Sequence, residues 1–394
     1  MKVAGIIAEY NPFHNGHARH IAATRAAGAT HCIIVLGSHF TQRGEPSLLP
    51  KAVRPRMALA GGADLVLELP QPWSCASAEG FAHGGAALLH HTGVVDILSF
   101  GSESGDTAAI VRAAEKMNTP PFSAAVREQL KSGISYAAAQ ERALSAVCGE
   151  DAAALLRQPN NTLGVEYCRT LLRLGSAVTP FAVLRTGAAH DADKAENGIA
   201  SASYIRAQLA EGRPVDAFLP PESATLLRGT VKAGHYTGDT ALIDRILLSR
   251  LRMKDAATLA ALSGVSEGLE NRLFSALQNA ASLQEVLDTV KTRRYTLSRL
   301  RRILTAAFLE LPTAFEKSEP PYLRVLGIGE KGAELLRKMR DTATLPLFTD
   351  AMQPPTDSFS QRVFALECKA SDLYGSLLSV PLPCGQEFTV GMQR

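Results

Sequence analysis

The chain has 394 residues, of which 46% are hydrophobic and 20% charged, and its formal net charge is +3. This length exceeds what one hydrophobic core usually serves, and the composition is ordinary for a soluble globular protein, so we expect two domains. No stretch approaches the roughly 18 uninterrupted apolar residues of a membrane span, and the N-terminus lacks a signal peptide, so we expect a cytoplasmic protein without membrane contact. The six cysteines are scattered without a CxxC pair, which favours free thiols and no structural metal.

The first two hundred residues alternate short apolar runs with helical patterns. The expected strands are Val3–Ala8, His31–Leu36, Asp64–Leu69, Val95–Phe100 and Pro180–Leu184. The expected helices include His17–Ala27, Pro55–Ala60, Ala78–His90 and Thr162–Leu174. Near-continuous apolar strands that alternate with helices predict a doubly wound, Rossmann-like α/β domain with a parallel sheet over residues 1–213. The carboxyl ends of such strands share one edge, where a ligand is expected to bind.

From residue 214 the pattern becomes helical. The expected helices are Ala241–Met253, Ala257–Leu262, Leu269–Gln278, Leu283–Val290 and Leu297–Leu309, and Met352–Phe359 reads as a loop. Residues 225–394 hold 22 Lys and Arg against 18 Asp and Glu, and Lys291–Arg302 contains six cations and no acid. We therefore predict a mostly helical, basic domain over residues 214–394.

The first twenty residues carry the strongest chemical signal. An apolar run leads into Glu9-Tyr-Asn-Pro-Phe13 and then His14-Asn-Gly-His17. A strand that ends at Asn-Pro and continues as a helix behind a glycine is a phosphate-binding arrangement. Two imidazoles on either side of that glycine can both donate to phosphate oxygens, although a pair of capping or solvent-facing histidines is the simpler alternative. The segment resembles the HxGH signature of adenylyl-transferring enzymes.

A second segment, Ile199–Arg206, resembles the ISSTxIR signature that accompanies HxGH in the nucleotidyltransferase superfamily. The hydroxyls of Ser201 and Ser203 can bond phosphate and cap the following helix, and Arg206 adds a cation for departing pyrophosphate. Ala202 replaces a hydroxyl-bearing residue of the signature. Read alone, the segment is only a capped helix. The predicted catalytic set is His14, His17, Ser201, Ser203 and Arg206.

Further motifs narrow the resemblance. They are Glu9–His17, Phe40–Pro46, Gly62–Pro70, Ser77–Ala82, Phe100–Glu103, Asn160–Gly164, Val265–Arg272, Thr296–Arg302 and Tyr322–Gly327. Together they are similar to the tRNA(Met) cytidine acetate ligase family over nearly the whole chain. That resemblance implies a HUP-type nucleotidyltransferase fold. It also implies activation of acetate with ATP to acetyl-adenylate, and acetyl transfer to the wobble cytidine of elongator tRNA(Met), which gives N4-acetylcytidine.

The resemblance also implies a nucleotide site, with ATP as substrate and Mg²⁺ bound to ATP rather than to a ligand motif. The residues that it carries over are Ile7, Ala8, Glu9, Tyr10, Asn11, Pro12, Phe13, His14, Asn15, Gly16, His17, Ala18, Arg19, His20, Gly101, Asn160 or Asn161, and Arg185. Glu9 has two interpretations: it orients an imidazole or a substrate amine, or it is structural. The role of His39, near the expected site, is open.

Cations in two segments are the predicted RNA contacts. They are Arg43, Lys51 and Arg54 after the second strand, and Arg293, Arg294, Arg299, Arg301 and Arg302 in the basic run, where Tyr295 is a candidate to stack on a base. For both segments the alternative is a solvated charged surface. Leu326–Gly332 is either a glycine-rich phosphate grip or a tight turn between helices.

The sequence thus favours an ATP-dependent tRNA-modifying ligase whose partners are elongator tRNA(Met) and acetate, with no protein partner inferred. Two alternatives stay open. One is a small-molecule adenylyltransferase of cofactor biosynthesis, which would share the first domain without needing a basic helical extension. The other is a non-catalytic tRNA-binding protein that retains a nucleotide fold.

Overall fold

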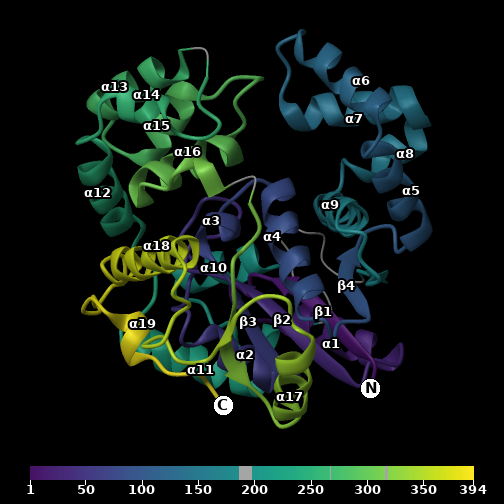
Figure 1. Cartoon of the computed structure of the whole chain (residues 1–394). Coiled ribbons are helices and arrows are strands. Elements are labelled where there is room, and N and C mark those ends of the chain that lie inside the picture. Colours follow the sequence, from purple (N-terminus) through teal and green to yellow (C-terminus); the bar gives the residue numbers. More distant parts are fainter. Residues whose placement is uncertain (186–197, 267, 316–317) are drawn as a thin grey trace.

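The computed structural model describes residues 1–185, 198–266, 268–315 and 318–394 (Figure 1). Its centre is a seven-stranded sheet of order β5-β4-β1-β2-β3-β6-β7. The strands are β1 (Val3–Ala8), β2 (His31–Gly37), β3 (Leu65–Leu69), β4 (Ile97–Ser102), β5 (Thr179–Leu184), β6 (Leu323–Ile328) and β7 (Leu347–Phe348). The first five are mutually parallel, which confirms the predicted doubly wound domain and all five of its predicted strands.

Helices cover the sheet on both faces and extend beyond one edge. Those beside the sheet are α1 (Asn15–Ala26), α2 (Arg54–Ala60), α3 (Gln71–Ser74), α4 (Ala78–His91), α9 (Pro159–Arg173), α10 (Ala202–Ala210), α11 (Pro221–Lys232), α17 (Gly332–Thr342), α18 (Ser358–Gly375) and α19 (Gln386–Thr389). Two short 3₁₀ segments lie at Asp216–Phe218 and Thr313–Phe315. Within the described ranges, no helix is both long and apolar enough to cross a membrane.

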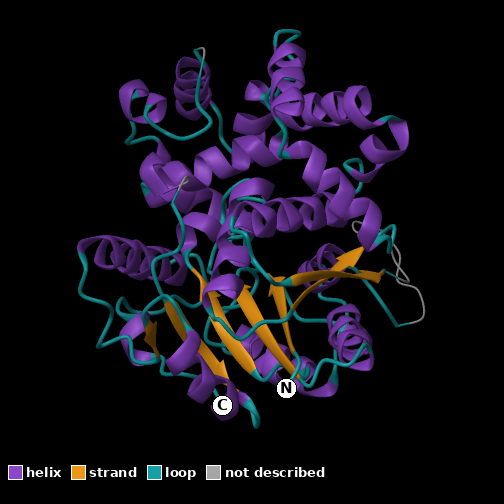
Figure 2. Cartoon of the chain, turned by 45° about the vertical axis from the view of Figure 1, so that its right-hand side comes forward, coloured by secondary structure: helices purple, strands orange, loops and turns teal. Residues whose placement is uncertain are grey.

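Two further groups of helices stand above the sheet, at the upper left and upper right of Figure 1. Figure 2 shows the strands as one layer below them. One group consists of α5 (Thr107–Met117), α6 (Pro120–Leu130), α7 (Tyr136–Cys148) and α8 (Glu150–Leu155). The other consists of α12 (Thr240–Leu251), α13 (Ala256–Ala260), α14 (Leu269–Asn279), α15 (Leu283–Val290) and α16 (Leu297–Leu309). The second group confirms the five helices predicted there, whereas α5–α8 carry no prediction.

The strands are buried because helices cover both faces of the sheet. Ile33 and Val35 of β2 pack into one core with Leu65 and Leu67 of β3, while Ile34 belongs to the core on the opposite face. Successive side chains of a strand point to opposite faces, so a strand covered on both faces must be apolar throughout. Residues of α12–α16 form most of a third core, which Phe40, Cys75 and residues in and just after α18 complete.

The C-terminal half is mostly helical, as expected, but it also contributes two strands to the sheet. β6 runs antiparallel beside β3, and β7 pairs with β6. The interpretation of Leu326–Gly332 as a turn between helices is wrong, because the segment joins β6 to α17 and packs on the start of β3. Gly329 N donates to Asp64 O at 2.8 Å, and a Cβ on Gly332 would lie 2.3 Å from Asp64 O.

Candidate active site

A cavity of about 380 Å³ lies at the carboxyl ends of β1, β4 and β5, and is closed further by α1, α9, α10 and residues 41–45. Most of the predicted site residues line it. They are Ile7, Ala8, Glu9, Tyr10, Asn11, His14, Gly16, His17, Arg19, His20, Arg43, Gly101, Asn160, Arg185, Ser201, Ser203 and Arg206. Residues up to two hundred positions apart thus meet at the edge of the sheet where a ligand is expected. We call this cavity the nucleotide pocket.

Five predicted nucleotide-binding residues do not line this pocket: Pro12, Phe13, Asn15, Ala18 and Asn161. Phe13 is buried, and its ring packs so closely on Gly61 that a Cβ there would lie 2.2 Å from it. Asn15 Nδ2 donates to two carbonyl oxygens, at 2.9 and 3.0 Å. Phe13 and Asn15 therefore pack and bond against neighbouring segments of the chain and not into the pocket.

The two neighbouring asparagines differ in burial and in position relative to the pocket. Asn161 is 2% exposed, and its Oδ1 accepts from Ser102 Oγ at 2.6 Å and from Glu103 N at 3.0 Å. Asn160 lines the pocket, and its Nδ2 donates to Glu103 Oε1 at 2.6 Å. Asn160 therefore lines the pocket, while Asn161 holds the turn after β4.

His14 and His17 begin α1 as a reciprocal capping pair. The Nδ1 atom of His14 accepts from Gly16 N at 3.1 Å, and that of His17 accepts from His14 N at 3.2 Å. Because each Nδ1 is an acceptor, the proton of each neutral ring is on Nε2. The rings are stacked with centroids 3.7 Å apart. Capping therefore fixes two neighbouring Nε2–H donors at a helix N-terminus, a site that favours phosphate.

The second signature forms another helix N-terminus at the same pocket. Ser201 caps α10, with its Oγ accepting from Tyr204 N at 3.0 Å and lying 3.0 Å from Ser203 Oγ. Arg206 Nη1 donates to Asn11 O at 2.8 Å. α10 is thereby joined to the loop before α1, and two hydroxyls, a guanidinium and a second helix dipole meet where anionic oxygens would bind.

His20 is held neutral on the β4 side of the pocket. Its Nε2 lies 2.9 Å from Ser99 Oγ, which also bonds Thr24 Oγ1 at 2.7 Å. Burial, and to a smaller extent the nearby charge of Arg185, lowers the pKa of His20 to about 4. Burial also lowers the pKa of Arg185, whose Cγ would lie 3.3 Å from a Cβ on Gly101. The glycine thus gives Arg185 room across the strand end.

This neutral imidazole predicts a pH dependence of stability. The folded-state pKa of His20 lies below its unfolded value, so the stabilisation is complete above about pH 6.5 and is lost as pH falls toward 4. Because one side of the ring faces the pocket, we expect a loss of about 1–2 kcal/mol. Denaturant unfolding at pH 7.5 and 5 should show a smaller loss for His20→Gln than for the unsubstituted protein. Equal losses of unfolding free energy in the two proteins would contradict the assignment of His20 as a buried neutral imidazole.

Two predicted RNA contacts, Lys51 and Arg54, are wrong, because both side chains are buried. Arg54 is 0% exposed, and it donates to Glu9 O at 2.9 Å, Gly37 O at 2.8 Å and Ser38 O at 2.6 Å. It therefore links the carboxyl ends of β1 and β2. Neither side chain can reach the phosphates of an RNA in this structure.

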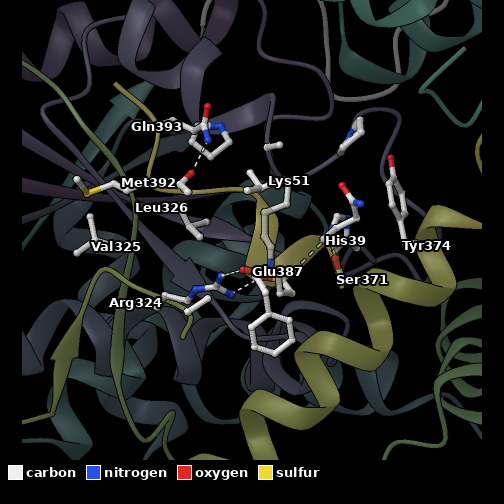
Figure 3. Close-up of a pocket in the computed structure, with 18 of the residues that line it drawn as sticks. His39, Lys51, Arg324, Val325, Leu326, Ser371, Tyr374, Glu387, Met392 and Gln393 are labelled. Atoms are coloured by element: carbon white, nitrogen blue, oxygen red, sulfur yellow. Dashed lines mark hydrogen bonds and ion pairs between the residues drawn. The ribbon is translucent and has the colours of Figure 1, made fainter. Parts of the chain in front are cut away.

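Lys51 belongs to a buried ionic cluster beside a second, smaller cavity of about 100 Å³ (Figure 3). Its Nζ lies 2.5 Å from carboxylate oxygens of Glu68 and Glu367 and 2.6 Å from Glu387. Arg324 pairs with Glu387 at 2.5 Å and Glu68 at 3.2 Å. We call Lys51, Glu68, Arg324, Glu367 and Glu387 the buried cluster. It joins β3 and β6 to α18 and α19.

His39 lines this second cavity and not the nucleotide pocket. Its Nε2 lies 3.1 Å from Ser371 Oγ, and its ring stacks on Tyr374 with centroids 4.3 Å apart. Burial lowers the pKa of His39 to about 4. His39 is therefore a neutral packing residue beneath α18.

In the basic run before and within α16, some side chains pack against the protein and others are exposed to solvent. Tyr295 is 6% exposed and its hydroxyl donates to Ser266 O at 2.9 Å, so the prediction that it stacks on a base is wrong. The Arg299 guanidinium lies 4.9 Å from the centre of that ring. Arg301 pairs with Glu45 at 2.7 Å. Arg293 is exposed.

Two carboxylates at the third strand, Asp64 just before β3 and Glu68 within it, form ion pairs with cationic side chains. Asp64 pairs with Arg25 at 2.7 Å and accepts from Cys32 N, while Glu68 belongs to the buried cluster. Both carboxylates therefore have structural roles. In the four described ranges, no group of three or more His, Cys, Asp or Glu side chains is arranged to hold a metal ion.

Comparison with known proteins places this site in a family. A family model described as HIGH Nucleotidyl Transferase matches residues 1–385. A tRNA(Met) cytidine acetate ligase of Syntrophotalea carbinolica is 41% identical over 89% of this chain and 85% of its own length. A protein of the same name from Clostridium kluyveri is 36% identical over 98% of both chains.

Solved structures give the same result. The crystal structure of apo Thermotoga maritima TmcAL matches with a TM-score of 0.94 and 32% identity, over 100% of this chain and 99% of the other. A second structure of that protein, bound with alpha-thio ATP, matches with a TM-score of 0.90. The chain therefore belongs to the tRNA(Met) cytidine acetate ligase family of HIGH nucleotidyltransferases.

Proposed function

We propose that this protein uses ATP to activate acetate as acetyl-adenylate and transfers the acetyl group to the wobble cytidine of elongator tRNA(Met), forming N4-acetylcytidine in the cytoplasm. One observation carries the proposal. The two signatures, at the N-termini of α1 and α10, meet in one pocket of a chain whose curated relatives bear this name.

In the first step an acetate oxygen attacks the α-phosphorus of ATP, and the bond to pyrophosphate breaks. Negative charge grows on the phosphoryl oxygens, so catalysis requires fixed donors more than a nucleophile. The Nε2–H groups of His14 and His17 supply such donors at the α-phosphate. Ser201, Ser203 and Arg206 hold the departing pyrophosphate. Mg²⁺ would arrive with ATP and offset phosphate charge.

In the second step the exocyclic amine of cytidine attacks the acetyl carbon, and AMP departs. No covalent intermediate with the protein is needed. The relatives' names favour this reaction over a cofactor adenylyltransferase and over a non-catalytic tRNA-binding protein.

Incubation with ATP, acetate and tRNA tests the proposal. We expect AMP formation that requires acetate, and full turnover only with tRNA. AMP formation without acetate, or adenylyl transfer to a free mononucleotide, would favour the cofactor adenylyltransferase. Binding of tRNA without any AMP formation would favour the non-catalytic alternative.

For tRNA we propose that residues 214–394 hold the backbone, with Arg293, Arg294, Arg299, Arg301 and Arg302 around α16 and Arg43 at the pocket. Phosphate contacts of this kind position RNA without reading its sequence. Arg301 and Arg43 are connected through residues 41–45, because Arg301 pairs with Glu45 in that segment. A tRNA bound along α16 would therefore lie next to the nucleotide pocket.

Charge reversal of the exposed Arg293 tests this surface. Arg293→Glu is expected to weaken tRNA binding about tenfold at low salt, and to reduce the slope of log affinity against log salt by about 1. The matched control is Lys2→Glu, an exposed cation at the opposite end of the molecule, beside the N-terminus in Figure 1. Equal effects of both variants in filter binding would count against a tRNA contact at Arg293.

A further inference from the structure

The nucleotide pocket has two sides that follow the order of the strands. On the β5–β4 side lie Gly101, Asn160 and Arg185; on the β1–β2 side lie Glu9 and residues 41–45. The segment 41–45 is docked on α16: Arg301 pairs with Glu45 at 2.7 Å, and Thr305 Oγ1 donates to Gly44 O at 2.8 Å. An RNA held on α16 would therefore approach the pocket from the Glu9 side.

Glu9 lies on this side of the pocket and, unlike Glu45, forms no ion pair with α16 among the described residues. It lines the pocket, and its Oε1 accepts from Gln42 N at 2.6 Å. One hydrogen bond leaves further acceptor capacity, because a carboxylate has about four lone-pair sites. Among the described residues that line the pocket, the other acidic one is Glu45, which is ion-paired with Arg301. Glu9 thus combines position with the capacity to accept a proton.

Burial and the neighbouring cations have opposite effects on the pKa of Glu9, so the pKa can change when a ligand attracts one of those cations. Burial raises the pKa of Glu9, while the bond from Gln42 N and the guanidinium groups of Arg206, Arg43 and Arg54 oppose the rise. Tyr167, on α9, also faces this carboxylate. A bound phosphate would draw Arg206 toward its own charge and leave the Glu9 carboxylate more basic.

We propose that Glu9 is the general base of acetyl transfer and accepts the proton that the cytidine amine loses as it attacks the acetyl-adenylate. The inference rests on the proposed function. The new bond joins the cytidine N4 atom to the acetyl carbon. The bond from that carbon to the phosphate oxygen breaks, AMP leaves with the electron pair, and the Glu9 carboxylate becomes a carboxylic acid.

The chemistry of the two steps assigns this base to the second one. Acetate is already an anion near neutral pH and needs no deprotonation, and a carboxylate beside it would repel it. An exocyclic amine is weakly nucleophilic and must lose a proton before the amide is complete. The other titratable groups of the pocket fit this less well. The Nδ1 atoms of His14 and His17 are occupied by backbone N–H groups, and His20 is bonded to Ser99.

Glu9→Gln tests the inference because it keeps an oxygen acceptor for Gln42 N and removes the base. The two half-reactions are measured separately, as acetate-dependent exchange of pyrophosphate into ATP and as single-turnover transfer from acetyl-adenylate to tRNA. We expect transfer to fall at least about 100-fold more than exchange. We also expect the rise of the transfer rate with pH to disappear in Glu9→Gln.

Glu45→Gln is the matched control, since it neutralises the neighbouring acidic residue, and it should keep the pH dependence of transfer. Thermal melts of both variants report folding. Equal losses in the two half-reactions of Glu9→Gln, or transfer at the unsubstituted rate, would overturn the role of Glu9. Absence of acetate-dependent exchange in the unsubstituted protein would instead overturn the proposed function, so the two failures are distinguishable.

Discussion

His14→Asn is expected to lower the rate of acetyl-adenylate formation by about 10²–10³-fold while leaving the fold intact. The histidine has two roles that this substitution separates. Its Nδ1 caps α1 by accepting from Gly16 N, and in the proposed mechanism its Nε2–H donates to the charge that develops at the α-phosphate. Asparagine is among the best N-cap residues, so the cap survives and the donor is lost.

His14→Ala is the companion variant. It loses the cap as well as the donor, and we expect a further loss of about 1 kcal/mol of folding stability. Acetate-dependent exchange of pyrophosphate into ATP measures the first effect, and denaturant unfolding measures the second. Retention of exchange within about threefold in His14→Asn would remove His14 from the chemistry and leave it a capping residue only.

Lys51→Met is expected to give the largest loss of stability, about 3–5 kcal/mol, because it leaves buried carboxylates without their shared cation. Lys51 Nζ lies within 2.6 Å of an oxygen of Glu68, Glu367 and Glu387. Arg324 alone would then face three carboxylates. Urea unfolding at pH 7 measures the loss.

The buried cluster also provides a control. Burial, together with the charge of the adjacent Glu68, raises the pKa of Glu367 to about 7, so Glu367 is a carboxylate that can be neutralised. The double variant Lys51→Met/Glu367→Gln should therefore recover part of the loss. In Lys51→Met the folded-state pKa of Glu367 rises further above its unfolded value because the neighbouring cation is lost, so the deficit should shrink as pH falls from 7 toward 5. A deficit that is constant with pH and not relieved by Glu367→Gln would contradict the electrostatic explanation.

The sequence predicted those elements whose signals are local. The apolar runs of β1–β5 mark strands covered on both faces, and the spacing of Leu300, Leu304 and Phe308 marks the buried side of α16. Helices α5–α8 carry local signals too, such as the caps Asp106 and Ser135, but their short amphipathic patterns were not recognised as helices.

The features that could not be predicted depend on residues that are far apart in the sequence and form ion pairs in the fold. β6 contains Arg324 at a buried position, which argues against a strand until Glu68 and Glu387 are seen beside it. Lys51 reads as a loop cation, although one of its partners, Glu367, lies 316 positions away. The same limit applies to Asn160 and Asn161, since only the turn after β4 distinguishes them. Pairing across the chain decides which charges are buried.

The site itself was more predictable than the surface around it. The two signatures identify His14, His17, Ser201, Ser203 and Arg206, and all five line one pocket. Short motifs keep their spacing because they form helix N-termini, whose geometry is local. The choice of RNA contacts depends on exposure, which the motifs do not encode, and Lys51 and Arg54 were misassigned for that reason.

Mass spectrometry of tRNA nucleosides after reaction with ATP and isotope-labelled acetate tests the central claim most directly. The account predicts that the label appears in N4-acetylcytidine, at the wobble position of elongator tRNA(Met), and that His14→Asn slows its appearance by about 10²–10³-fold. Unlabelled cytidine in every tRNA, under conditions where the protein is folded and binds ATP, would contradict the account.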